Sequence, residues 1–304
     1  MLQNMVAVQN QETRAHIGHL FWYSIGDDLY SRSLLEQTLV RAGLSLSYMP
    51  NEIRPVDAFR RATKEVETSL NQGNGLQENY ITRDVYYDPV TAVRHIVKET
   101  VDSKGKRLSY NENEAILTLD KKADAIHFSA DPNSYAWKLC EEAVRLFEVF
   151  KEHHNGQAVR GMVQAVLKTL SPTPVRPSGG VYFIPAVHDR ALCQLVQFCS
   201  SFAKGEGFKI PVVNSEESVR MVETKVKDHL DSLLGQCRQA LQDGSIPKAK
   251  LAELINETKN VVAGYRDYEE IIQKSKQEID GRIEIIRDAL SLLMDKVKAG
   301  ENMG

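Results

Sequence analysis

Long apolar runs are absent from this sequence. No stretch approaches the roughly 18 consecutive apolar residues that a membrane-spanning helix needs. The first residues, MLQNMVAVQNQETRAH, also lack the basic start and apolar core of a secretory signal. We therefore expect a cytoplasmic protein without a membrane partner.

Cysteine is scarce, and its spacing excludes the usual cysteine-based frameworks. The four cysteines are Cys140, Cys193, Cys199 and Cys237, and no two of them form a C-x-x-C. Three of the four stand among apolar residues at helical spacing, which is typical of reduced thiols in a cytosolic core. The spacing does not favour a zinc site. We therefore expect no disulfide, no metal and no cofactor.

Charge of one sign is not in large excess. The chain has 38 Lys and Arg against 41 Asp and Glu, a formal net charge of −3. Apolar residues make up 42%, an ordinary share for a globular protein that buries a core. Any contact with nucleic acid must therefore come from a local basic patch.

Catalytic motifs are missing as well. The run SGG at 178–180 lacks the lysine and the spacing of a phosphate loop, so it indicates a turn. His188 followed by Asp189 would suit an oriented base, but no Ser or Cys stands in a recognisable nucleophile elbow. His16 and His19 should point to opposite faces of a strand and make a poor metal pair. We expect no catalytic residue.

Residues 1–130 predict an α+β domain. Aromatic and β-branched residues from Ile17 to Ile25 predict a buried strand. Helical periodicity follows in 33–42, and Pro55 opens a second short helix that extends to Leu70. Four further segments separated by short turns predict an antiparallel β-meander with flanking helices, and they cover 79–87, 92–102, 106–119 and 124–129.

Residues 131–213 predict a helical domain with a winged-helix-like segment. One helix covers 134 to about 153, Asn155 and Gly156 break it, and a further helix runs to Leu170. Two short apolar arms follow around the turn at 178–180. This order of helix, helix and hairpin is compatible with a module whose helix enters the major groove while its wing touches phosphate. A purely structural wing is the alternative.

Six cations are candidates for contact with nucleic acid. Three belong to the winged-helix-like segment, and three form a small basic cluster on the second short helix. Solvated surface charge is the simpler interpretation of each group. The six residues are Arg160, Lys168, Arg176, Arg60, Arg61 and Lys64.

Residues 214–304 predict a long antiparallel helical hairpin, similar to a coiled coil. Asn214 and Glu217 resemble a capping box at the start of its first helix. Apolar residues three or four positions apart form a seam on each helix, and a turn at 243–247 separates the two. The helices would have about 28 and about 50 residues, lengths of roughly 42 and 75 Å.

The longer helix would overhang its partner, and the overhang carries a candidate interface. An exposed apolar stripe of this kind is typical of an interaction patch. Either the body of the same chain covers it, or a second copy or another protein does. The candidate interface residues are Ile272, Ile279, Ile283, Ile286, Leu290 and Leu293.

Several short blocks resemble a known family. They are LFWYSI, the helix that ends in AGL, PVDAFRRATK and VRPSGGVYFIP, within about the first 200 residues. The chain is similar in these blocks to an uncharacterised family of bacteriophages and bacterial mobile elements. The resemblance implies a setting in a phage, a prophage or a bacterial cytoplasm. It implies no activity and no site residues.

The function that these patterns favour is a non-catalytic binding or adaptor protein. It would act by protein–protein interaction and self-assembly through its C-terminal helices, as a phage–host interaction factor or a scaffold. One alternative is a nucleic-acid-binding protein that uses the winged-helix-like segment. The other is an enzyme of unknown reaction.

Overall fold

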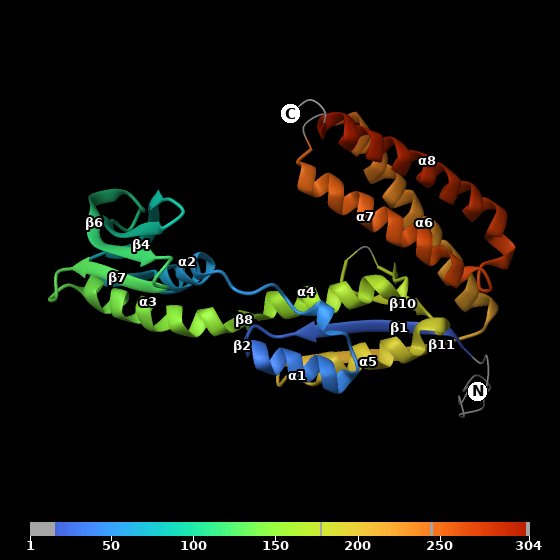
Figure 1. The fold of residues 1–304 in the computed structure, drawn as a ribbon, viewed down its shortest axis with the longest axis horizontal. Coiled ribbons are helices and arrows are strands. Elements are labelled where there is room, and N and C mark those ends of the chain that lie inside the picture. Colours follow the sequence, from blue (N-terminus) through green and yellow to red (C-terminus); the bar gives the residue numbers. More distant parts are fainter. Residues whose placement is uncertain (1–15, 177, 244–245, 302–304) are drawn as a thin grey trace. The chain divides into compact units, whose positions relative to one another are not determined.

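The computed structural model describes residues 16–176, 178–243 and 246–301, and the chain divides into two compact units (Figure 1). Unit 1 contains Met1–Asp28, Glu36–Met49 and Gly156–Gly304, and unit 2 contains Leu29–Leu35 and Pro50–Asn155. These borders differ from the predicted ones after residues 130 and 213. The N-terminal segment considered as a possible signal and the turn residues 244–245 lie outside the described residues.

Unit 2 is an antiparallel meander covered by helices, as the β-rich segments separated by short turns predicted. Its sheet has the order β3-β4-β5-β6-β7, and every neighbouring pair is antiparallel. The strands are β3 (Thr68–Gly73), β4 (Leu76–Tyr87), β5 (Thr91–Val101), β6 (Arg107–Asp120) and β7 (Ala125–Ala130). The helices α2 (Pro55–Glu65) and α3 (Tyr135–Glu152) share a buried core with one face of this sheet. A short pair, β2 (Leu29–Ser31) and β8 (His153–Asn155), completes the unit.

The second short helix was predicted five residues too long. It ends at Glu65, and Thr68–Gly73 joins the sheet as an edge strand. The local sequence after Glu65 has no strong breaker, so pairing with β4 decides its conformation. Propensity over such a short segment is easily overridden by tertiary contacts.

Unit 1 is built on a four-stranded antiparallel sheet with the order β11-β1-β10-β9. Its strands are β1 (His16–Ile25), β9 (Thr173–Pro174), β10 (Tyr182–Pro185) and β11 (Gly205–Val213). The helices α4 (Gly156–Leu167) and α5 (Asp189–Ser200) lie against the sheet, and α1 (Arg32–Ala42) crosses the border between the units. Short 3-10 turns η1 (Leu46–Tyr48), η2 (Lys168–Leu170) and η3 (Ala186–His188) connect these elements.

The winged-helix-like segment does not form a separate module. Its first helix, α3, belongs to unit 2, whereas α4 and the β9–β10 hairpin belong to unit 1. The hairpin is instead part of the four-stranded sheet, because β10 also pairs with β1. The turn prediction was right: Gly179 and Gly180 have φ of +106° and +64°, a backbone conformation that glycine adopts without strain.

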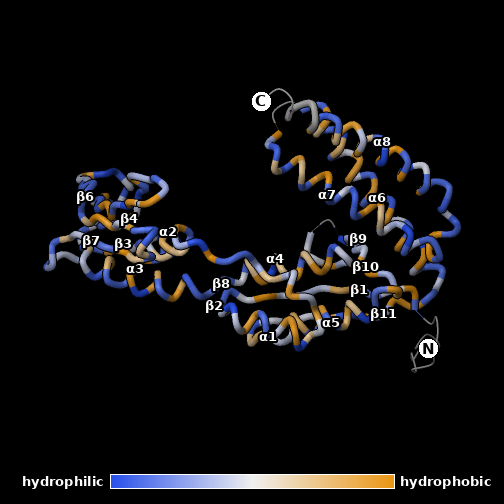
Figure 2. The backbone as a smooth tube through the Cα atoms, in the orientation of Figure 1, coloured by the Kyte–Doolittle hydropathy of each residue, from blue (hydrophilic) through white to orange (hydrophobic). Residues whose placement is uncertain are grey.

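The C-terminal part of unit 1 contains three long helices instead of the predicted two. They are α6 (Glu216–Gln242), α7 (Lys248–Gly264) and α8 (Lys276–Glu301), and Figure 2 shows hydrophobic and hydrophilic residues alternating along them. The 3-10 turns η4 (Tyr265–Tyr268) and η5 (Gln273–Ser275) interrupt the expected 50-residue helix. The start of α6 is also capped one residue later than predicted, by Ser215, whose Oγ accepts from Ser218 N at 3.2 Å.

The interruption follows from contacts that the local pattern does not encode. Tyr268 is buried, and its hydroxyl donates to the carbonyl of Ser171 at 2.5 Å. Gly264, at the end of α7, lies so close to Ser171 that a Cβ would stand 2.4 Å from the serine Oγ. The chain therefore turns where it meets the sheet body, and α8 runs back along α6 and α7.

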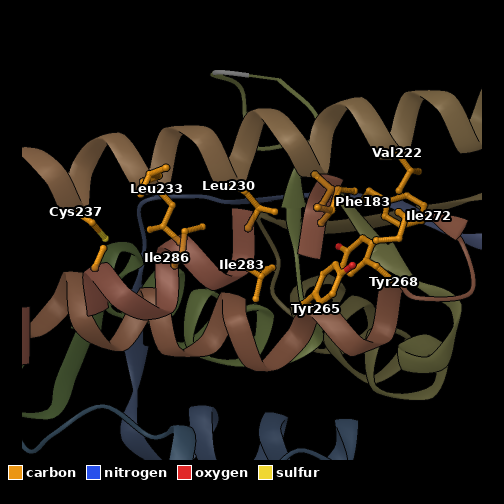
Figure 3. Packing of buried hydrophobic residues seen from close by; sticks show 14 of the residues in the cluster. Phe183, Val222, Leu230, Leu233, Cys237, Tyr265, Tyr268, Ile272, Ile283 and Ile286 are labelled. Carbon is orange, nitrogen blue, oxygen red and sulfur yellow. The ribbon is translucent and has the colours of Figure 1, made fainter. Parts of the chain in front are cut away.

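The predicted interface stripe is buried by its own chain. Five of its six residues are at most 2% exposed, and all six pack in one core with α6, α7 and the sheet residues Ile17, Phe183 and Val212 (Figure 3). The overhang that motivated an external partner is therefore not present. The buried five are Ile272, Ile279, Ile283, Ile286 and Leu293, and Leu290 is partly buried.

Among the described residues, no helix combines the length and the apolar character that a membrane span requires.

Replacing Gly264 tests the contact that ends α7. We expect Gly264→Ala to lower the free energy of unfolding by about 1–3 kcal/mol, because the new methyl group overlaps Ser171. Gly235→Ala in α6 is the matched control, since its Cβ would meet nothing within 4 Å. The control should stabilise the protein by roughly 0.5–1 kcal/mol. Urea unfolding measures both, and equal effects of the two substitutions would contradict the proposed contact.

Candidate functional site

Unit 1 contains a cavity of about 240 Å³ between the helical bundle and the sheet body. Its walls come from α4, η2, β9, β10, α6, α7 and η4. The lining residues are Gln164, Leu167, Lys168, Ser171, Pro172, Thr173, Pro174, Tyr182, Val226, His229, Leu230, Glu257, Asn260, Val261, Gly264, Tyr265 and Tyr268. Elements distant in the sequence therefore enclose one space.

A hydrogen-bonded turn forms the floor of the cavity. Ser171 has a left-handed backbone, with φ of +50°, between η2 and β9. Thr173 Oγ1 and the Tyr268 hydroxyl lie 2.8 Å apart and are both buried. Burial raises the pKa of Tyr268, so its hydroxyl stays protonated at neutral pH. These bonds hold the end of α7 against the sheet and keep the cavity walls at a defined separation.

Apolar side chains form one wall. Leu230 is 3% exposed, Val226 is buried beside it on α6, and Val261 faces the same space from α7. Figure 3 shows Leu230 and Tyr265 pointing into the space between the helices. A wall of this kind favours a ligand with an apolar part.

Four polar side chains on the cavity have no protein partner. Among the residues that the structure describes, none of their side chains makes a hydrogen bond or an ion pair. Burial lowers the pKa of His229, so that its imidazole is neutral at neutral pH. The four residues are Lys168, His229, Glu257 and Asn260. An apolar pocket with a few convergent polar groups is the usual form of a small-molecule site.

A serine, an aspartate and a histidine meet beside the cavity, but not in the order that catalysis needs. Ser171 Oγ donates to Asp267 Oδ2 at 2.5 Å, and His188 Nε2 lies 2.8 Å from the same oxygen. In a catalytic triad the imidazole stands between the hydroxyl and the carboxylate, so that it can accept the hydroxyl proton. Here the carboxylate stands in the middle. The three residues therefore link η3, the turn before β9 and η4, and they do not activate the serine.

His188 and its neighbour Asp189 do not bond to each other. His188 bonds to Asp267, whereas Asp189 forms an ion pair with Lys209 of β11. Burial alone would raise the pKa of Asp189, but the hydrogen bond from Lys209 holds it below its ordinary value. Adjacent residues at the start of a helix point in different directions, and the neighbouring elements decide their partners.

The three cations of the segment that was predicted to be winged-helix-like have separate roles. Arg160 donates to the carbonyl of Ile25 at 2.9 Å and pairs with Asp27 at 3.1 Å. Lys168 lines the cavity, and Arg176 is exposed in the β9–β10 loop. Arg160 therefore links α4 to the end of β1, and the three cations do not form one patch of unpaired charges.

The basic cluster on α2 is also largely engaged within unit 2. Arg61 donates to the carbonyl of His153 at 3.0 Å, and its guanidinium stands 4.3 Å from the centre of the Phe150 ring. Lys64 pairs with Glu67 at 2.5 Å. Arg60 is exposed and lies 5.8 Å from the Tyr87 ring.

A second polar cluster, which sequence reasoning missed, lies where β1 and β11 meet α5. Lys209 Nζ contacts Asp189 and lies 2.9 Å from Cys193 Sγ, and His19 Nε2 is 3.4 Å from Asp189. A bulge in β1 between His16 and Gly18 brings the rings of His16 and His19 to 4.8 Å, so the expectation of opposite faces was wrong. Among the described residues no group of three side chains is arranged to hold a metal ion.

Thiol labelling tests the environments of the four cysteines. Only Cys193 is exposed, and burial raises the pKa of Cys140 and of Cys199 to about 12. Iodoacetamide should therefore modify Cys193 in the native protein and leave the other three unmodified. Peptide mass spectrometry measures the labelling, and Cys193→Ser should abolish it. Labelling of a second cysteine at a comparable rate would contradict this arrangement.

The buried imidazole of His19 should make stability depend on pH. Its pKa is lowered from 6.5 to about 4, mainly by burial and then by Lys209. The unfolded chain then binds the proton first, so the free energy of unfolding falls as the pH drops from about 6.5 to about 4, by roughly 3 kcal/mol. His19→Asn should remove this part of the pH dependence. If the wild type and His19→Asn lose the same free energy of unfolding over this pH range, His19 is not the cause of the pH dependence.

The comparisons place the chain in a family but give no activity. A family model described as "Family of unknown function (DUF6744)" matches residues 16–299, so the chain belongs to this family. No curated protein matches the chain, and no solved structure does. The function must therefore be argued from the cavity and its residues.

Proposed function

We propose that this member of a family of unknown function is a non-catalytic binding protein, and that its site is the cavity between the bundle and the sheet of unit 1. One observation carries the proposal. An apolar wall and four polar side chains that have no hydrogen-bond or ion-pair partner among the described residues line the same space. Lys168 and Asn260 are exposed and His229 and Glu257 are half-buried, so these groups can exchange contact with water for contact with a bound small molecule.

Binding is favoured over catalysis by the arrangement around Asp267. Its carboxylate accepts from both Ser171 and His188, so the imidazole is not placed to take the proton of the serine hydroxyl. The remaining groups on the cavity include no cysteine and no pair of carboxylates. The proposal therefore assigns recognition, and not a reaction, to this site.

The cavity is also a better candidate than the C-terminal seam. The apolar stripe of α8 is covered by α6 and α7, so self-assembly is not needed to remove it from water. Nucleic-acid binding has less support, because Arg61, Lys64 and Arg160 already have protein partners. A setting in a phage or mobile element, and in a bacterial cytoplasm, remains part of the proposal on the strength of the short sequence blocks alone.

Filling the cavity tests the proposal. We expect small aromatic and aliphatic fragments to bind the wild type in ligand-observed NMR, and Val261→Trp to weaken them at least about tenfold, since the indole would occupy the site. Ala263→Trp is the matched control, because it places the same side chain on an exposed position of α7 that does not line the cavity. The proposal fails if no fragment binds, or if both tryptophan variants bind as the wild type does.

A further inference from the structure

Two opposite charges face the cavity without neutralising each other. Lys168 extends from η2 and Glu257 from α7. Among the described residues neither forms an ion pair, with each other or with any other group. On α6 and α8 several surface charges do pair, such as Lys227 with Glu278 and Arg282 with Asp231. The cavity therefore offers one cation and one anion that are both available to a ligand.

Glu257 is half-buried, whereas Lys168 is exposed. The apolar wall lowers the dielectric around Glu257, so an ion pair with this carboxylate is worth more than the same pair in open water. Asn260, one helical turn after Glu257 on α7, adds an amide that both donates and accepts. The site therefore suits a molecule that carries a positive and a negative group close together.

The volume limits the size of that molecule. About 240 Å³ lies below the roughly 300–1,000 Å³ of sites for drug-sized ligands. The apolar wall of Val226, Leu230 and Val261 then requires a compact hydrocarbon part beside the two charged groups.

We infer that the cavity binds a free amino acid with an apolar side chain. Its carboxylate faces Lys168, its ammonium group faces Glu257, and its side chain packs against Val226, Leu230 and Val261. Charge-assisted hydrogen bonds at both ends fix the orientation of the ligand. This inference rests on the proposed binding function and names the ligand class of the same site.

Calorimetry with paired ligands tests the two charged contacts. The probes are L-leucine and L-phenylalanine, with N-acetyl-L-leucine lacking the ammonium group and L-leucinamide lacking the carboxylate. We expect the two amino acids to bind and each derivative to bind at least about tenfold more weakly than L-leucine. Equal binding of leucine and both derivatives would overturn the inference.

Two variants assign the charges to their residues. Lys168→Met should weaken L-leucine at least about tenfold without weakening L-leucinamide further, and Glu257→Gln should do the same for L-leucine and N-acetyl-L-leucine. Lys259→Met and Glu253→Gln are the controls, since both residues are exposed on α7 and do not line the cavity. If Lys168→Met and Glu257→Gln bind L-leucine as tightly as the wild type does, the assignment is overturned.

The outcomes separate this inference from the proposed function. If fragments bind and Val261→Trp excludes them, but neither amino acid binds or competes, the cavity is a binding site and the amino-acid inference is wrong. If no fragment and no amino acid binds, the proposed function itself fails.

Discussion

The contact between η4 and the turn before β9 is the constraint on which unit 1 depends. The Tyr268 hydroxyl bonds to the Ser171 carbonyl at 2.5 Å and lies 2.8 Å from Thr173 Oγ1, and both Tyr268 and Thr173 are buried. Asp267, the preceding residue, joins the same turn to His188. A buried polar group without a partner is costly, so these bonds specify one way for the bundle to meet the sheet.

That contact has two consequences. It interrupts the long helix after Gly264, which lets α8 return along α6 and bury the stripe of isoleucines within its own chain. It also holds α7 at a distance from α4 and β9, and the space between them is the cavity. The same few bonds therefore remove an apparent interaction surface and create a site for a small molecule.

The side chains at the cavity favour ligand binding over catalysis, because those that could react are hydrogen-bonded to one carboxylate. Ser171 and His188 both bond to Asp267, whereas Lys168 and Glu257 have no hydrogen-bond or ion-pair partner among the described residues. A binding site needs polar groups that are not already bonded within the protein, and a catalytic site needs a nucleophile and a base in contact. The cavity meets the first requirement.

The sequence by itself determined the elements whose pattern is local. Short turns between β-rich segments predicted the meander of unit 2, helical spacing located α1, α2, α3, α4 and α6 to within a few residues of their ends, and glycines marked the β9–β10 turn. Only the tertiary structure decided the break at 265–275, because the apolar spacing continues through it and Tyr268 is held by residues almost a hundred positions away. It also decided the cavity, whose walls are distant in the chain, and the partners of His19, His188 and Asp189, because a bulge and a neighbouring strand set the direction of each side chain.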